Sequence, residues 1–205
     1  MGLGWKEWNR SDIIYGIIVP VIVVLVIVGF SQLSSLFGME SFGIVIGIIS
    51  EIEEMVIIVG VPLLLGLVWN RWAGGASGFL LGSIYAIWWY VKYGMFSGGM
   101  LFMGFGPTVL GYVLSAMLIG YMAGALNKRS ENFRRMVIAG VVSTTVGGLL
   151  LFWLFQLSPS NVITGVAGFL LTVLTRTACG VIIPVIAKVF MWYGMAINKK
   201  PDLES

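Results

Sequence analysis

The sequence predicts an all-α integral membrane protein, a bundle of six transmembrane helices. The chain is 59% hydrophobic and only 10% charged, whereas a soluble domain has roughly 25% charged residues. Its mean hydropathy is +0.99. Its apolar runs approach the roughly 20 residues that are needed to cross a bilayer. These runs use almost all of the 205 residues, so we expect no separate soluble domain.

The chain divides into a short N-terminal segment, a membrane domain and a tail. Trp5 and Trp8 near the N-terminus fit a membrane interface. The apolar run that follows them is too long for a cleavable signal and has no small-residue cleavage site after it, so we expect a retained helix. The predicted parts are an interfacial segment, a six-helix transmembrane domain and a cytosolic tail, at residues 1–11, 12–197 and 198–205.

Polar or glycine-rich turns separate the expected spans. The first span is rich in isoleucine and valine, and the last is longer than a bilayer requires. We expect the six spans at about residues 13–30, 43–72, 74–93, 106–126, 136–157 and 164–197.

The second span is irregular, because glutamates interrupt residues 43–72. Either one long tilted helix covers this segment, or a re-entrant piece at 43–50 precedes a span that begins near Met55. Gly60 and Pro62 are the candidate positions for a kink.

The basic residues predict the orientation. Cytosolic ends of spans carry an excess of Lys and Arg, and the three loops on one side of the predicted bundle hold at most Lys92. We therefore expect both termini in the cytosol of a multi-pass protein of the cell membrane. Basic turns of this kind suit the lipid bilayer rather than nucleic acid. The nine basic residues on the other side are Lys6, Arg10, Arg71, Lys128, Arg129, Arg134, Arg135, Lys199 and Lys200.

Charged residues inside spans are the first candidate site. A charge at mid-bilayer costs roughly 2.5–3.5 kcal/mol on insertion scales, so such side chains pair or face a cavity. Glu51 and Glu54 share a helix face, because they are three residues apart. Counted from the outer side, Glu54 and Arg176 lie at similar depth in their spans. We expect these two to form a structural ion pair or to line one polar pocket.

Other candidate binding residues lie toward the outer side. Tyr85, Trp88 and Trp89 share a face of span three, either as an interfacial belt or as a stacking wall for a flat or cationic ligand. Thr172 shares a face with Arg176. Asn161 in the last outer loop is either a helix cap or a ligand contact.

Small residues recur at every fourth position in spans three and four. Such stripes let two helix backbones approach closely, which drives helix association in lipid. We expect them to serve helix packing or a partner interface. The stripe residues are Gly74, Gly78, Gly82 and Ala86 in one span, and Ala116, Gly120 and Gly124 in the other.

The sequence lacks residues and motifs that catalysis and metal binding commonly use. The chain has no histidine and a single cysteine, Cys179. It also lacks the P-loop, the zinc-protease motif and the serine-hydrolase elbow. We therefore expect no enzyme, no metal and no cofactor.

The glycine-rich entry to span three, WAGGASGFLLGSIYAI, and the end of span four, LIGYMAGALNKR, resemble the substrate-binding S components of energy-coupling factor transporters. The resemblance implies a membrane subunit that binds a vitamin-like nutrient from outside. It also implies a coupling membrane subunit and two cytosolic ATPases as partners. In that family the outer loops cap the ligand, and their counterparts here are residues 31–42, 94–103 and 158–163.

Two other functions stay open from the sequence. One is a non-catalytic accessory subunit of a membrane complex, whose stripes would be partner surfaces. The other is a small ion-coupled or proton-coupled carrier that uses Glu51, Glu54 and Arg176.

Overall fold

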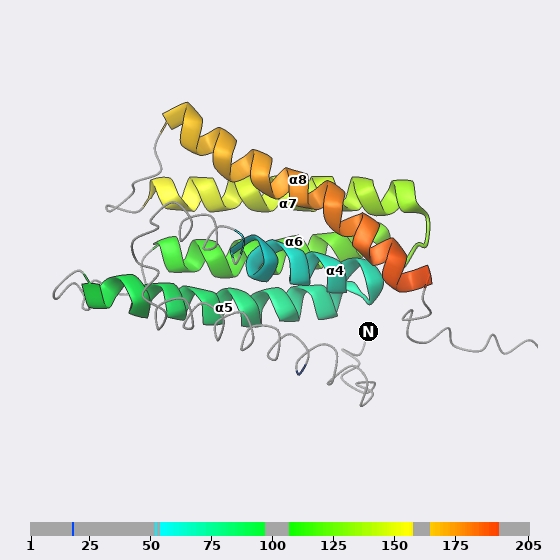
Figure 1. The fold of residues 1–205 in the computed structure, drawn as a ribbon, viewed down its shortest axis with the longest axis horizontal. Coiled ribbons are helices and arrows are strands. Elements are labelled where there is room, and N and C mark those ends of the chain that lie inside the picture. The colour runs from blue at the N-terminus through cyan, green and yellow to red at the C-terminus, as the bar shows by residue number, and fades with distance from the viewer. Residues whose placement is uncertain (1–17, 19–51, 53, 97–106, 158–164, 193–205) are drawn as a thin grey trace, which may run out of the picture.

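The computed structural model describes residues 18, 52, 54–96, 107–157 and 165–192, and side chains of residues 89–96 are not described. Within these ranges the chain is helical and contains no strand. A π-helical segment, η3, leads directly into α4, and four long helices follow (Figure 1). The bounds are Met55–Gly60 for η3, Val61–Val68 for α4, Arg71–Phe96 for α5, Pro107–Asn127 for α6, Phe133–Gln156 for α7 and Gly165–Trp192 for α8.

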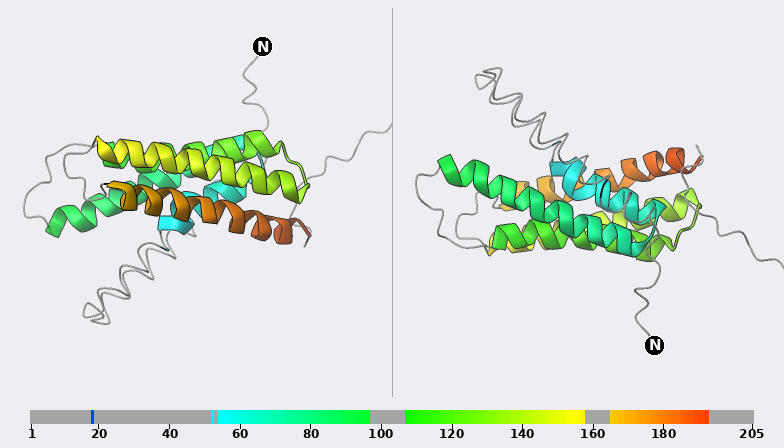
Figure 2. Two further views of the ribbon diagram at one scale, coloured as in Figure 1. Left: turned by 90° about the horizontal axis from the view of Figure 1, so that it is seen from above. Right: turned by 90° about the horizontal axis from the view of Figure 1, so that it is seen from below.

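The four long helices pack in chain order. α6 lies between α5 and α7, and α8 packs on α7. The shorter α4 packs against α6, α5 and, less extensively, α8. Figures 1 and 2 show the long helices running alongside one another, so that consecutive helices are antiparallel.

In the part of the chain that the structure describes, three helices, α6, α7 and α8, are long and apolar enough to cross a membrane. The 21 residues of α6 correspond to about 31 Å, which matches the hydrocarbon thickness of a bilayer. The 26-residue α5 has the length, but its glycines, tyrosines and tryptophans lower its hydropathy. The all-α class is thus confirmed. The count of six spans and the orientation stay predictions, because span one, residues 43–50, the N-terminal segment and the tail lie outside the described residues.

The second predicted span is irregular where the sequence indicates a kink. The helix is π-helical from Met55 to Gly60 and becomes α-helical at Val61. Pro62 lies in the first turn of α4, directly after η3, and its missing backbone N–H leaves a carbonyl of the preceding turn without a helical hydrogen bond. The change of helix type at Gly60 therefore coincides with the residues expected to break the span.

α5 begins at Arg71, three residues before the predicted start. Asn70 explains the earlier start, because its side-chain oxygen accepts a hydrogen bond of 2.8 Å from the Ala73 amide. This is an N-terminal helix cap. At the neighbouring end of α6, the buried Asn127 donates a hydrogen bond of 2.9 Å to the Leu67 carbonyl and so fastens α6 to α4.

The predicted small-residue stripes lie against each other inside the bundle. A methyl group added at Gly74 would collide with the carbonyl of Gly120, and one added at Gly78 would collide with that of Ala116. Gly82 lies against Val113 in the same way. The stripes of α5 and α6 therefore pack on one another within this chain.

A second close contact joins α7 and α8. A methyl group at Gly140 would collide with the Gly180 carbonyl, and one at Gly180 would collide with the Thr144 hydroxyl. Pro184, one turn after Gly180, lies inside α8 and is buried. These helices are thus also held at backbone contact.

We predict that Gly78→Ala lowers the stability of the folded chain by about 1–3 kcal/mol, the usual cost of overpacking. The new methyl group would meet backbone atoms of α6, which cannot rotate away. The matched control is Gly60→Ala, also at a buried glycine, where the nearest atoms lie 3.5 Å from the added carbon. Thermal unfolding of the full chain in detergent measures both. Equal transition temperatures for the two variants would contradict the prediction.

Candidate functional site

An ion pair between Glu54 and Arg176 joins the start of η3 to α8. The two residues are 122 positions apart in the chain. The Arg176 side chain is 3% exposed and that of Glu54 is 14% exposed. Removing two charges from water is costly, and their mutual attraction together with further hydrogen bonds offsets that cost. The expected pairing of Glu54 with Arg176 is therefore confirmed.

The guanidinium of Arg176 is only partly satisfied by the described residues. Its Nη2 donates to Glu54, and its Nη1 donates to the Thr172 carbonyl at 3.1 Å. Its buried Nε has no hydrogen-bond partner in the described ranges. The stem passes Gly148, where an added methyl group would be in ordinary van der Waals contact with the Arg176 Cδ at 3.4 Å.

Aromatic side chains from three helices form a group that reaches Glu54 through Tyr112. The Tyr112 hydroxyl of α6 donates to the second carboxylate oxygen of Glu54 over 3.5 Å, which is a long hydrogen bond. The Tyr112 ring makes edge contacts with Tyr85 of α5, at 5.2 Å between centroids, and with Phe155 of α7, at 5.4 Å. Trp88 packs on Tyr85 at 5.7 Å. We call Tyr85, Trp88, Tyr112 and Phe155 the aromatic cluster.

The structure brings together four of the predicted site residues: Glu54, Arg176, Thr172 and Tyr85. Thr172 is buried, and its carbonyl rather than its hydroxyl contacts Arg176. The position of Tyr85 differs from both expectations for its helix face. It is 3% exposed, so it lies neither in an interfacial belt nor on an open stacking wall. The reason is that this face of α5 turns toward Tyr112 on α6.

The structure gives less information on the other predicted site residues. Trp88 is half-buried and packs on the core. Glu51, the side chain of Trp89 and Asn161 lie outside the described residues, as do the three outer loops. Their proposed ligand contacts stay predictions.

Tyr112 and Phe155 are the site residues that the sequence did not single out. Tyr112 lies four residues before Ala116, so it continues the stripe that ends at Gly124. Residues four apart share a helix face, and this spacing is the signal that places Tyr112 inside the bundle. Phe155 has no comparable signal, because it is one of several phenylalanines near the ends of apolar spans.

The groups around the ion pair are suited to binding rather than to bond making. Guanidinium is a preferred partner for carboxylates and phosphates, and aromatic rings stack on flat apolar groups. Among the described side chains no three of the His, Cys, Asp and Glu type gather as a metal site would require. Comparison of the chain with protein-family models, with curated proteins and with solved structures gave no match.

We predict that breaking the ion pair on one side is more damaging than removing both charges. Arg176→Met would leave Glu54 buried without its counter-charge, and the expected loss of stability is about 3–5 kcal/mol. The double variant Glu54→Gln with Arg176→Met should lose less than the sum of the two single losses. A double-mutant cycle by thermal unfolding measures the coupling. Additive losses would show that the two side chains are energetically independent.

Proposed function

We propose that this protein is a multi-pass subunit of the cell membrane that binds a small solute for uptake. The observation that carries the proposal is the buried Glu54–Arg176 pair with its partly satisfied guanidinium and its aromatic neighbours. Ionisable side chains inside a membrane are expensive, and they mark substrate or ion sites more often than not.

The distribution of charge supports entry of the solute from the side opposite the basic turns. Arg71, Lys128 and Arg134 lie at helix ends that meet at one end of the bundle (Figure 1), and the positive-inside rule assigns this end to the cytosol. Arg176 lies about 16 Å along α8 from Gly165 and about 24 Å from Trp192 at a rise of about 1.5 Å per residue. The ion pair is thus nearer to the end that we assign to the outside.

The chemistry of the site favours a solute with an anionic group and a flat ring. A ligand carboxylate would compete with Glu54 for Arg176 and would use the Nε that has no partner in the described ranges. A flat ring would pack beside Trp88, the half-buried member of the aromatic cluster. Many vitamin-like nutrients combine these two features, which agrees with the resemblance to S components. Transport by such a subunit would require a coupling membrane subunit and two cytosolic ATPases.

One observation favours a second candidate, a proton-coupled carrier. Glu54 keeps 14% exposure beside its cation, so a proton could replace Arg176 as the partner of the carboxylate. An accessory subunit draws less support, because the stripes of Gly74, Gly78 and Gly120 are already filled by this chain's own helices.

We predict that carboxylate-bearing ring compounds of the vitamin class raise the unfolding temperature of the full chain in detergent. A ligand at about 100 times its Kd stabilises the folded state by about 2.7 kcal/mol. Tyr112→Phe should weaken this binding about fivefold, within the net range of one hydrogen bond, because the Tyr112 hydroxyl donates to Glu54 and would still hold that carboxylate when the ligand takes Arg176.

The matched control is Tyr121→Phe. Tyr121 also lies on α6, but its ring contacts Trp72, away from the ion pair. Equal weakening by the two variants, or no stabilising compound in the series, would contradict the binding proposal. Proton-driven flux in proteoliposomes that is abolished by Glu54→Gln would support the carrier instead.

A further inference from the structure

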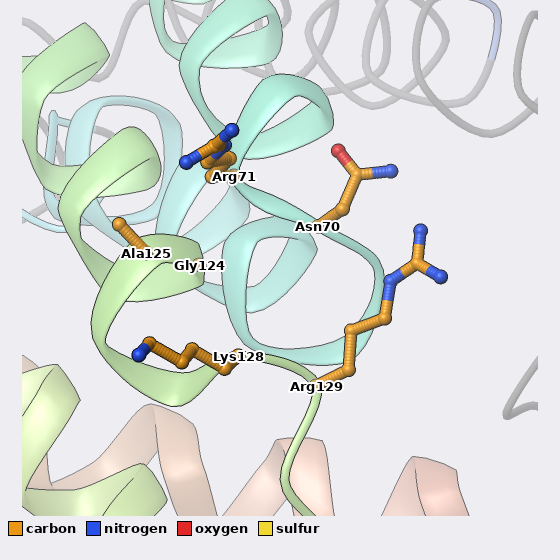
Figure 3. A pocket seen from close by; sticks show the side chains of 6 residues that line it. All are labelled: Asn70, Arg71, Gly124, Ala125, Lys128 and Arg129. Atoms are coloured by element: carbon orange, nitrogen blue, oxygen red, sulfur yellow. The ribbon is translucent and has the colours of Figure 1, made fainter.

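An open groove with basic residues in its lining lies at the basic end of the bundle, apart from the Glu54–Arg176 pair. Its volume is about 320 Å³, which is at the small end of the range for ligand sites. Two segments far apart in the chain form it: the turn between α4 and α5, and the last turn of α6 with the residues after it. The lining residues are Asn70, Arg71, Gly124, Ala125, Lys128 and Arg129 (Figure 3).

The lining carries three cations and no carboxylate. Figure 3 shows the side chains of Asn70 and Arg129 next to each other on one side of the groove, with Lys128 on the other side. Their formal charges add to a strongly positive site in which nothing from the lining neutralises them. Such a site favours an anion, and guanidinium groups together with an ammonium are the usual partners of a phosphate.

The backbone that presents two of these cations is held in an uncommon conformation. Lys128 and Arg129 have φ angles of 50° and 58°, in the left-handed region that non-glycine residues rarely adopt. Two such residues in succession cost free energy, which is typical of ligand clamps and tight turns. Arg129 is fixed by its Nε, which donates to the Trp69 carbonyl at 2.9 Å, and this leaves its two Nη groups for a ligand.

Gly124 brings the two walls of the groove together. A methyl group at Gly124 would collide with the backbone of Arg71 and would lie 2.8 Å from the Asn70 carbonyl carbon. The turn before α5 therefore rests directly on the end of α6. Without this contact Arg71 and Lys128 would not line one groove.

The surroundings of the groove are those of a membrane interface. Trp72 is 61% exposed, and the Arg71 guanidinium lies 5.4 Å from the centre of its ring. Exposed tryptophans concentrate at the headgroup level of bilayers. Exposed apolar side chains also lie on α6, at Leu110, Met117 and Leu126. A lipid could place its phosphate in the groove and its acyl chains along this helix.

We propose that the groove binds the phosphate group of an anionic phospholipid. The cations of the lining hold the phosphate, the left-handed turn presents Lys128 and Arg129, and Trp72 marks the depth of the glycerol region. The site is at the opposite end of the long helices from the aromatic cluster, so its test does not depend on the solute proposed above.

The experiment uses the full chain in nanodiscs of phosphatidylcholine, with and without added phosphatidylglycerol. Native mass spectrometry counts retained lipids, and thermal unfolding measures the stabilisation. Lys128→Asn removes one charge but keeps a residue that tolerates the left-handed conformation. We expect it to weaken phosphatidylglycerol binding about fivefold, the value of one cation near an anionic surface, and Lys128→Arg to retain binding.

The matched control is Arg134→Gln, which removes an exposed cation at the same end that does not line the groove. We expect this control to change binding less than twofold. Equal losses for Lys128→Asn and Arg134→Gln would overturn the site in favour of diffuse attraction. Equal retention of phosphatidylcholine and phosphatidylglycerol would also overturn it. A last experiment adds inorganic phosphate to the protein in phosphatidylcholine nanodiscs. If phosphate raises the unfolding temperature as much as phosphatidylglycerol does, the assignment of the groove to a lipid is overturned.

Discussion

The close approach of three helix backbones at Gly66, Gly74 and Gly120 is the constraint on which the rest of the structure depends. Methyl groups at Gly66 and Gly74 would each collide with the Gly120 carbonyl, and α4, α5 and α6 meet at this point. A glycine inside a helix costs about 1 kcal/mol relative to alanine. In lipid, where no hydrophobic force acts between helices, backbone contact of this kind supplies the dispersion energy that holds them together.

This convergence explains where the polar groups lie. Because α4 packs tightly on α5 and α6, the π-helical η3 that precedes it leads back into the interior, and Glu54 reaches Tyr112 on α6 and Arg176 on α8. At the other end, the same contact brings the turn after α4 onto Gly124 and forms the basic groove. One packing arrangement thus positions an ion pair inside the bundle and a group of cations at its end.

Much of this arrangement follows from spacing along the sequence. The four-residue period of Gly74 and Gly78 predicts a packing face, and the helical rise places Glu54 and Arg176 at one depth. Periodicity does not give the direction in which a face turns, and for this reason the expectation of an interfacial belt or a stacking wall did not include the packing of Tyr85 on Tyr112. The signal was present, since Tyr85 lies three residues after the stripe residue Gly82. Gly60 and Pro62 indicate a kink in the second span, but no sequence pattern indicates that the preceding segment is π-helical. The reason is that hydrophobic patterns assume 3.6 residues per turn.

The packing also determines which helix could respond to a ligand at Arg176. α8 meets α7 in backbone contact at Gly140 and Gly180, but its apolar window is only 28% buried, against 44% for α6 and α7. Pro184 cannot donate the helical hydrogen bond that the Gly180 carbonyl would otherwise accept, and this carbonyl lies against Gly140. A ligand that takes Arg176 from Glu54 must break a contact between η3 and α8. Because α8 is the least enclosed of these helices and has a weakened turn after Arg176, we expect it to be the helix that moves.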